Sequence, residues 1–196
     1  MRRKKRPQKI AVKPAKVLLG IGLILLSMVS LYFMLSGVVA SAPGPVSDGD
    51  NYVVPVPVNY PEPELELENI NGDVESLKDL HGQVLLVNNW ATWCPPCKAE
   101  MPTLASYFSA HAHEGFMVIA IEAGDPRDQV AKFAEDFNLP FTVWLDPSSK
   151  ALNAFRNGNL PSSYVVDRNG TIRYAWTGEI NQEMLEKYVT PLLSEG

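Results

Sequence analysis

The segment Val84–Pro102 reads VLLVNNWATWCPPCKAEMP and holds the only two cysteines of the chain, Cys94 and Cys97. The apolar run at its start is typical of a central strand that is covered on both faces. The Cys-Pro-Pro-Cys motif after it favours a helix start, because proline fits the first turn of a helix. A thiol at a helix N-terminus is stabilised as the thiolate, which is the form that attacks disulfides. The segment therefore predicts a redox-active dithiol at a strand–helix junction.

Two other interpretations of the cysteine pair are weaker. A structural zinc ion needs four ligands, of which this motif supplies two. The histidines that could complete the set, His81, His111 and His113, form no second ligand pair and look like surface residues. A purely structural disulfide between residues three apart would close a very small loop and stabilise the fold little.

The same segment resembles the active-site stretch of thioredoxin-fold proteins. Within them it is similar to the membrane-anchored TlpA/ResA group of extracytoplasmic thiol–disulfide oxidoreductases, which have a redoxin or AhpC/TSA-like domain. The likeness runs from about Pro63 to the C-terminus. It implies an α/β fold, a thioredoxin-like three-layer sandwich with an N-terminal β-hairpin extension, preceded by a single transmembrane helix.

Charge is distributed very unevenly along the chain. Eight of the 17 basic residues lie between Arg2 and Lys16, and no acidic residue precedes Asp48. The remainder carries nine basic and 22 acidic residues, a net charge of -13. Repulsion from phosphates makes so acidic a domain a poor nucleic-acid binder, and no nucleic-acid partner is expected.

Residues 17–40 read VLLGIGLILLSMVSLYFMLSGVVA and contain no charge. As a helix they would span about 36 Å, enough to cross a hydrocarbon core of about 30 Å. The basic segment 1–16 would keep the N-terminus in the cytoplasm, so the rest of the chain is expected outside it. A cleaved signal peptide is the alternative, but its apolar region is normally only about 7–15 residues long. We expect a single-pass anchor in the cell membrane.

Residues 41–62 are predicted to be a proline-rich linker, and residues 63–196 the thioredoxin-like domain. Pro55 and Pro57 argue against a strand in the linker, because proline cannot donate to a β-ladder. Within the domain, periodicity and turn signals predict a regular series of elements. They are strands at 64–70, 74–77, 84–87, 116–121, 141–145, 163–166 and 172–176, and helices at 96–111, 128–137, 150–156 and 181–194.

The resemblance also implies which residues contact the substrate. Leu160 and Pro161 precede a predicted strand, where the thioredoxin fold has a cis-proline that faces the active-site disulfide. The backbone of Leu160 would then lie beside Cys94 and pair with a substrate peptide. Trp93 is predicted to form an apolar lip next to Cys94, and Pro95 and Pro96 complete the substrate-contacting loop.

Release of the resolving cysteine, Cys97, needs a proton acceptor. Thioredoxin has a buried aspartate six residues before its first cysteine, whereas this chain has Asn88 there, which cannot accept a proton. The TlpA/ResA group likewise carries its carboxylates elsewhere. Glu100, one helical turn after Cys97, and Asp125 are the predicted catalytic acids. Glu122 competes with Asp125 for this role.

These observations predict a membrane-anchored thiol–disulfide oxidoreductase that carries no cofactor beyond the Cys94–Cys97 disulfide. The resemblance suggests a reductase of protein disulfides, with apocytochrome c as a candidate substrate and a CcdA/DsbD-type membrane protein as electron donor. One alternative is a dithiol oxidase that forms disulfides in exported proteins. Another is a non-enzymatic adaptor or metallochaperone that holds Cu(I) through the two cysteines.

Overall fold

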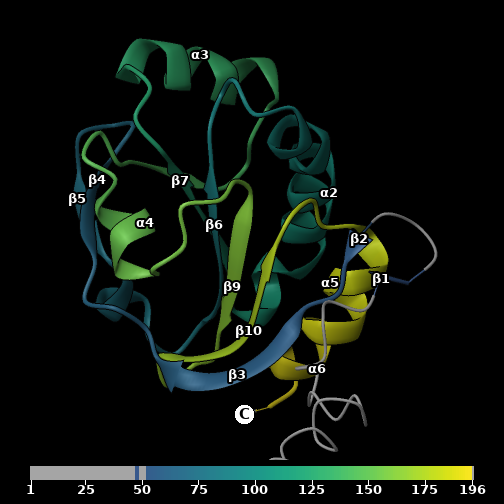
Figure 1. Ribbon diagram of the computed structural model, residues 1–196. Coiled ribbons are helices and arrows are strands. Elements are labelled where there is room, and N and C mark those ends of the chain that lie inside the picture. Colours follow the sequence, from purple (N-terminus) through teal and green to yellow (C-terminus); the bar gives the residue numbers. More distant parts are fainter. Residues whose placement is uncertain (1–46, 49–51, 196) are drawn as a thin grey trace, which may run out of the picture. The chain divides into compact units, whose positions relative to one another are not determined.

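The structure, a computed structural model, describes residues 47–48 and 52–195 (Figure 1). Its main feature is an eight-stranded sheet in the order β3-β10-β9-β6-β7-β8-β4-β5, beside which a two-stranded sheet is formed by β1 and β2. The strands are β1 (Ser47–Asp48), β2 (Tyr52–Val53), β3 (Val56–Pro61), β4 (Glu66–Asn69), β5 (Val74–Ser76), β6 (Val84–Trp90), β7 (Phe116–Glu122), β8 (Thr142–Leu145), β9 (Ser162–Val166) and β10 (Thr171–Thr177).

Helices cover both faces of the sheet, which gives three layers (Figure 1). They are α2 (Pro95–His111), α3 (Arg127–Asp136), α4 (Lys150–Ala154), α5 (Gln182–Tyr188) and α6 (Thr190–Leu193), with short 3₁₀ turns at η1 (Leu77–Leu80) and η2 (Ala112–Glu114). One apolar core joins the sheet to α2, α3, α5 and α6, and a second joins the opposite face to η1 and α4. The thioredoxin-like α/β fold expected from the sequence is confirmed.

Strand β6 is the centre of the fold. It pairs in parallel with β7 and antiparallel with β9, and all seven of its residues are buried. Its side chains alternate between the two cores, since Leu86 packs on the α2 side whereas Leu85 and Val87 pack on the α4 side. This explains the continuous apolar run in the sequence, because a strand covered on both faces needs no polar alternation.

The first part of the domain adds strands at both edges of the sheet. Strands β4 and β5 pair antiparallel around a turn in which Gly72 has a φ of 97°, and β4 also pairs with β8. At the opposite edge β3 pairs antiparallel with β10. Residues 56–61 are thus part of the sheet. The prediction that the linker continues to residue 62 is therefore wrong for this segment.

Proline is compatible with β3 because this strand lies at the edge of the sheet. Pro57 and Pro61 have only β10 as a neighbour, and the register between the two strands shifts between Ile172 and Tyr174. An edge strand with a bulge can accommodate residues that lack an N–H group. A domain fragment that begins at Pro63 would therefore lose one edge of the sheet.

The closing helix predicted at 181–194 is two helices. Asn181 caps α5 by accepting a hydrogen bond from the Met184 N–H (2.9 Å), and α5 ends at Tyr188. A new helix, α6, starts at Thr190 and has Pro191 in its first turn. Proline cannot continue the hydrogen bonding of a helix, which explains the break.

Within the described residues no helix is long and apolar enough to cross a bilayer. The anchor predicted at 17–40 and the basic segment before it lie outside these residues.

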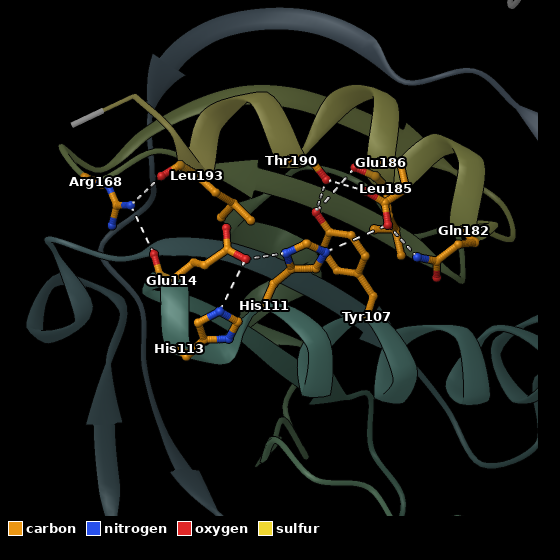
Figure 2. Close-up of polar contacts among 10 residues, drawn as sticks. All are labelled: Tyr107, His111, His113, Glu114, Arg168, Gln182, Leu185, Glu186, Thr190 and Leu193. Atoms are coloured by element: carbon orange, nitrogen blue, oxygen red, sulfur yellow. Dashed lines mark hydrogen bonds and ion pairs between the residues drawn. The ribbon is translucent and has the colours of Figure 1, made fainter.

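Polar side chains connect the C-terminal end of α2 to α5 and α6 (Figure 2). The hydroxyl groups of Tyr107 and Thr190 share a hydrogen bond of 2.9 Å. The ring of His111 packs on Tyr107 and lies 3.0 Å from Glu114 and 3.8 Å from Glu186. His111, expected at the surface, is therefore packed between helices, with 15% of its side chain exposed.

Arg168 connects the C-terminal residues of the chain to the segments just before β6 and β7. Its guanidinium donates to the carbonyls of Gly82 (2.9 Å), Glu114 (3.2 Å), Leu193 (2.9 Å) and Glu195 (3.3 Å). Figure 2 shows the contacts with Glu114 and Leu193.

We expect Arg168→Ala to lower the free energy of unfolding by about 1–3 kcal/mol, because these carbonyls lose a charged donor. Urea denaturation of Arg168→Ala and Arg168→Lys measures the effect, and dithiol activity should not change. Equal stability of Arg168→Ala and wild type would contradict this role.

Candidate active site

The two cysteines form a disulfide at the N-terminus of α2. Cys94 is the N-cap residue, and its sulfur accepts a hydrogen bond from the Cys97 N–H (3.3 Å). Cys97 is completely buried, whereas 3% of Cys94 is exposed. The first cysteine is therefore the sulfur within reach of a substrate, and the second is placed to attack it from inside the protein.

The loop between β6 and α2 is held by backbone hydrogen bonds. The Ala123 N–H donates to the Trp90 carbonyl (2.9 Å), and the Cys94 N–H donates to the Ala91 carbonyl (3.2 Å). Trp90 itself is buried and packs on Phe133 of α3, with 4.7 Å between ring centroids. The position of Cys94 thus depends on the ends of β6 and β7 together.

The surface around Cys94 carries the residues predicted to contact substrate. Trp93 is 65% exposed, and Pro95 and Pro96 are also exposed. The Leu160–Pro161 peptide bond is cis, as expected. Because Ser162 pairs with Asn89 of β6, this peptide lies at the same end of the sheet as the cysteines. The geometry agrees with a substrate surface, and the contacts with substrate remain a prediction.

Glu100 lies one turn after Cys97 on α2 and is completely buried. Its carboxyl oxygens accept hydrogen bonds from the Asn88 side-chain amide (2.8 Å) and from the Ile180 N–H (3.1 Å). Burial raises the pKa of Glu100 to about 8, although the two hydrogen bonds act in the opposite direction. The carboxyl is therefore mostly protonated at neutral pH, with a pKa close to that of an ordinary thiol.

Two pairs of polar side chains connect β6 and β9, and one of them supports Glu100. The Asn88 amide also donates to the Ser163 hydroxyl (2.9 Å), and Asn89 donates to Ser162 (3.3 Å). All four side chains are completely buried. The two serines are not among the site residues predicted from the sequence. Adjacent polar residues inside two otherwise apolar strands are the signal that could have identified them.

Asp125 holds the loop before Cys94 by hydrogen bonds to Thr92. Its carboxylate accepts hydrogen bonds from the Thr92 N–H (3.1 Å) and the Thr92 hydroxyl (2.6 Å), and its own N–H donates to Glu122 (2.9 Å). Partial burial raises the pKa of Asp125, but hydrogen bonds from Thr92 and Glu122 outweigh it and leave the pKa below the ordinary value. Asp125 is thus an ionised acceptor at neutral pH.

Glu122 ends β7 and is completely buried. Burial, and then the hydrogen bond to the Asp125 side chain, raise the pKa of Glu122 to about 8. Glu122 is predicted from the sequence only as an alternative to Asp125, whereas in the structure the two residues are hydrogen-bonded to each other. Of the predicted acids, only Glu100 is on the active-site helix.

No three His, Cys, Asp or Glu side chains of the described part of the chain are grouped as a metal site would require. The chemistry available to the described residues at this end of the sheet is that of two sulfurs and three carboxyl groups.

Comparison with known proteins agrees with this geometry. The model of the AhpC/TSA family matches residues 58–175. Thiol-disulfide oxidoreductase ResA of Geobacillus kaustophilus is 33% identical over 134 residues, which cover 68% of this chain and 77% of that protein. ResA of Bacillus subtilis is 25% identical over 177 residues, 90% of this chain and 93% of that protein.

Solved structures show the same fold. A thiol:disulfide interchange protein DsbE from Chlorobium tepidum superposes with a TM-score of 0.65 and 26% identity, covering 69% of this chain and 97% of that one. The family match, the relatives and the cysteine pair at the start of α2 lead to one assignment. The chain belongs to the AhpC/TSA family and is a thiol–disulfide oxidoreductase of the ResA/DsbE type.

Proposed function

We propose that this oxidoreductase works as a reductase of disulfides in exported proteins, anchored to the cell membrane with its catalytic domain outside the cytoplasm. The observation that carries the dithiol chemistry is the buried Glu100 carboxyl, one helical turn from the buried Cys97. Exchange in either direction passes through the Cys97 thiolate, so it needs a group at this sulfur that takes and returns a proton. The reductase direction rests on the resemblance to the TlpA/ResA group.

The reaction consists of two exchanges. The Cys94 thiolate attacks one sulfur of the substrate disulfide, a mixed disulfide forms, and the other substrate sulfur leaves as a thiolate. Cys97 then loses its proton to Glu100 and attacks the Cys94 sulfur, which releases the second substrate thiolate. The substrate gains two electrons, and the enzyme is left with the Cys94–Cys97 disulfide seen in the structure.

The raised pKa suits Glu100 to this step. An ordinary glutamate, with a pKa of about 4.3, would be too weak a base to take a proton from a thiol with a pKa of about 8.5. With a pKa of about 8, the two groups exchange the proton at little cost. Asn88, in place of a buried acid on β6, contributes a hydrogen bond to this carboxyl.

The substrate surface would consist of Trp93, Pro95, Pro96, and the cis peptide of Leu160 and Pro161. The exposed indole offers apolar contact, and the backbone beside the cis peptide offers hydrogen bonds to an extended peptide. Both features recognise backbone and apolar side chains, which suits unfolded or flexible substrates. Cysteine pairs of apocytochrome c, suggested by the resemblance, are our candidate substrate.

The anchor and the electron donor are part of the same proposal. The uncharged run 17–40 behind a basic segment supports a single-pass anchor, and the similarity to Bacillus subtilis ResA extends over 90% of this chain. An enzyme that ends each turnover oxidised needs a source of electrons. We propose a CcdA/DsbD-type membrane protein, with no bound cofactor and no nucleic-acid partner.

The redox state of the protein in its own cells tests the direction. Acid quenching followed by alkylation with a large maleimide separates reduced from oxidised protein on a gel. A reductase should be mostly reduced at steady state and become oxidised when its donor is deleted, with the Cys94→Ser/Cys97→Ser variant as the unlabelled control. A mostly oxidised protein in growing cells would contradict the proposal and favour an oxidase.

A further inference from the structure

The carboxyl end of β7 contains a glutamate that the exchange reaction above does not use. Glu122 pairs with Trp90 of β6 in the parallel register, and its carbonyl accepts a hydrogen bond from the Asp146 N–H (2.8 Å). Its backbone is therefore fixed from both neighbouring strands. Its side chain is completely buried, and Oε1 has no hydrogen-bond donor among the described residues.

The contacts of Glu122 lead directly to the cysteine loop. Glu122 Oε2 accepts the Asp125 N–H (2.9 Å), and the Asp125 carboxylate accepts both the N–H and the hydroxyl of Thr92 (3.1 and 2.6 Å). Thr92 is two residues before Cys94, in the loop that sets where α2 begins. A short chain of hydrogen bonds thus runs from the end of β7 to Thr92, two residues before the cysteine that bears the reactive sulfur.

We propose that Glu122 is a positioning residue for thiol–disulfide exchange, which acts by holding Asp125 in the orientation that fixes Thr92 and, through it, the Cys94 loop. The proposal concerns the dithiol activity itself, and holds for either direction of electron flow.

The two carboxyl groups lie close enough to affect each other's protonation. Burial, and then the interaction with the Asp125 side chain, raise the pKa of Glu122, whereas partial burial of Asp125 is outweighed by its interactions with Thr92 and Glu122, which leave the pKa of Asp125 below its ordinary value. Ionisation of Glu122 would place a second negative charge beside the half-buried Asp125 carboxylate, and the burial of Glu122 limits screening of their repulsion by water. Asp125 would then be pushed from Glu122, and the Thr92 hydrogen bonds would weaken above about pH 8.

No described cation faces Glu122 to relieve that repulsion. From α3, Arg127 is turned to Glu68 and to the carbonyls of Asn69 and Ile70. From the β8 side, the Asp146 carboxylate accepts the N–H groups of Lys150 and Ala151 at the start of α4.

The remaining neighbours are uncharged in the oxidised protein. From β6, Trp90 does not titrate, and the Cys94–Cys97 disulfide at the start of α2 titrates only after reduction. Asp125 is therefore the charged group that decides the protonation of Glu122.

The first test uses the oxidised full-length protein, in which no cysteine titrates. The chemical shift of the Thr92 amide, followed by ¹H–¹⁵N NMR, should titrate with a midpoint near pH 8 in wild type. Glu122→Gln keeps an N–H donor toward Asp125 but cannot ionise, so this titration should disappear. Glu100→Gln and the exposed Glu135→Gln should retain it. An unchanged Thr92 titration in Glu122→Gln would overturn the proposal.

The second test measures function. In the reduced protein at pH 6.5, Glu122→Ala should slow iodoacetamide alkylation of Cys94 by about tenfold or more, whereas Glu122→Gln should remain within about twofold of wild type. Wild-type rates in Glu122→Ala would also overturn the proposal, and if this variant does not fold the Thr92 titration decides. Neither test involves a physiological partner. The Thr92 titration and the Cys94 alkylation rate therefore do not depend on whether the protein acts as a reductase or as an oxidase.

Discussion

Replacing Cys94 with serine is expected to abolish disulfide reduction, with a loss of roughly 10³-fold or more, because the nucleophile is removed outright. A serine hydroxyl at the same N-cap position can still accept the Cys97 N–H, so the start of α2 should be preserved. The measurement is the rate of insulin reduction with a dithiol as electron source. Circular dichroism of the variant should be unchanged, which separates the chemical loss from misfolding.

The matched variant, Cys97→Ser, should fail in a different way. Its Cys94 can still attack, but the mixed disulfide cannot be resolved from inside the protein. We therefore expect one rapid turnover followed by a stable protein–substrate adduct on a non-reducing gel. Adducts on Cys94→Ser and none on Cys97→Ser would show that the assignment of the two sulfurs is inverted.

Replacing Glu100 with glutamine should slow the resolving step by about 10²–10⁴-fold at neutral pH, the usual contribution of a general base, and leave the attack by Cys94 unchanged. Glutamine keeps the size of the side chain and can still accept one of the two hydrogen bonds, from Asn88 or from Ile180, but it cannot take a proton. Stopped-flow measurement of mixed-disulfide decay gives the rate. In wild type it should rise with pH to a plateau above about pH 8, and in the variant this dependence should be lost.

The exposed Glu183→Gln on α5 serves as a control that removes a carboxylate without touching the network. Wild-type decay of the mixed disulfide in Glu100→Gln would show that Glu100 is not the proton acceptor.

The same carboxyl links stability to pH. The folded pKa of Glu100 lies above its unfolded value, so between about pH 4.5 and about pH 8 the folded state binds more protons than the unfolded state. The free energy of unfolding of wild type should therefore fall as pH rises through this range, by up to about 1.4 kcal/mol per unit of pKa difference. Urea titrations at pH 5 and pH 8 should show a smaller fall in Glu100→Gln. A larger fall in the variant would contradict the raised pKa.

Local signals in the sequence were sufficient for the fold and for the sulfur chemistry. The apolar run at Val84, the proline after Cys94 and the alternation in the later strands each reflect a short-range rule, and the sheet and α2 follow them. The carboxyl of Glu100 could also be predicted, since residues three apart on a helix share a face.

Interactions between distant segments could not be predicted in this way. Proline argued against a strand at residues 56–61, but pairing with β10 decided its conformation, because an edge strand needs donors on one side only. The contact of Asp125 with Thr92 joins residues 33 apart, and that of Asn88 with Ser163 joins residues 75 apart. Such pairs depend on strand order, which the sequence pattern alone does not contain.

The reduction potential of the Cys94–Cys97 pair tests the central claim most directly. The full-length protein would be equilibrated with dithiothreitol or glutathione buffers and its thiols quantified after quenching. About 30 mV corresponds to a tenfold change in the equilibrium of this two-electron couple. We predict a value near that of thioredoxin, about -270 mV, as a reductase requires. A value near about -120 mV, in the range of strong dithiol oxidants, would contradict the account.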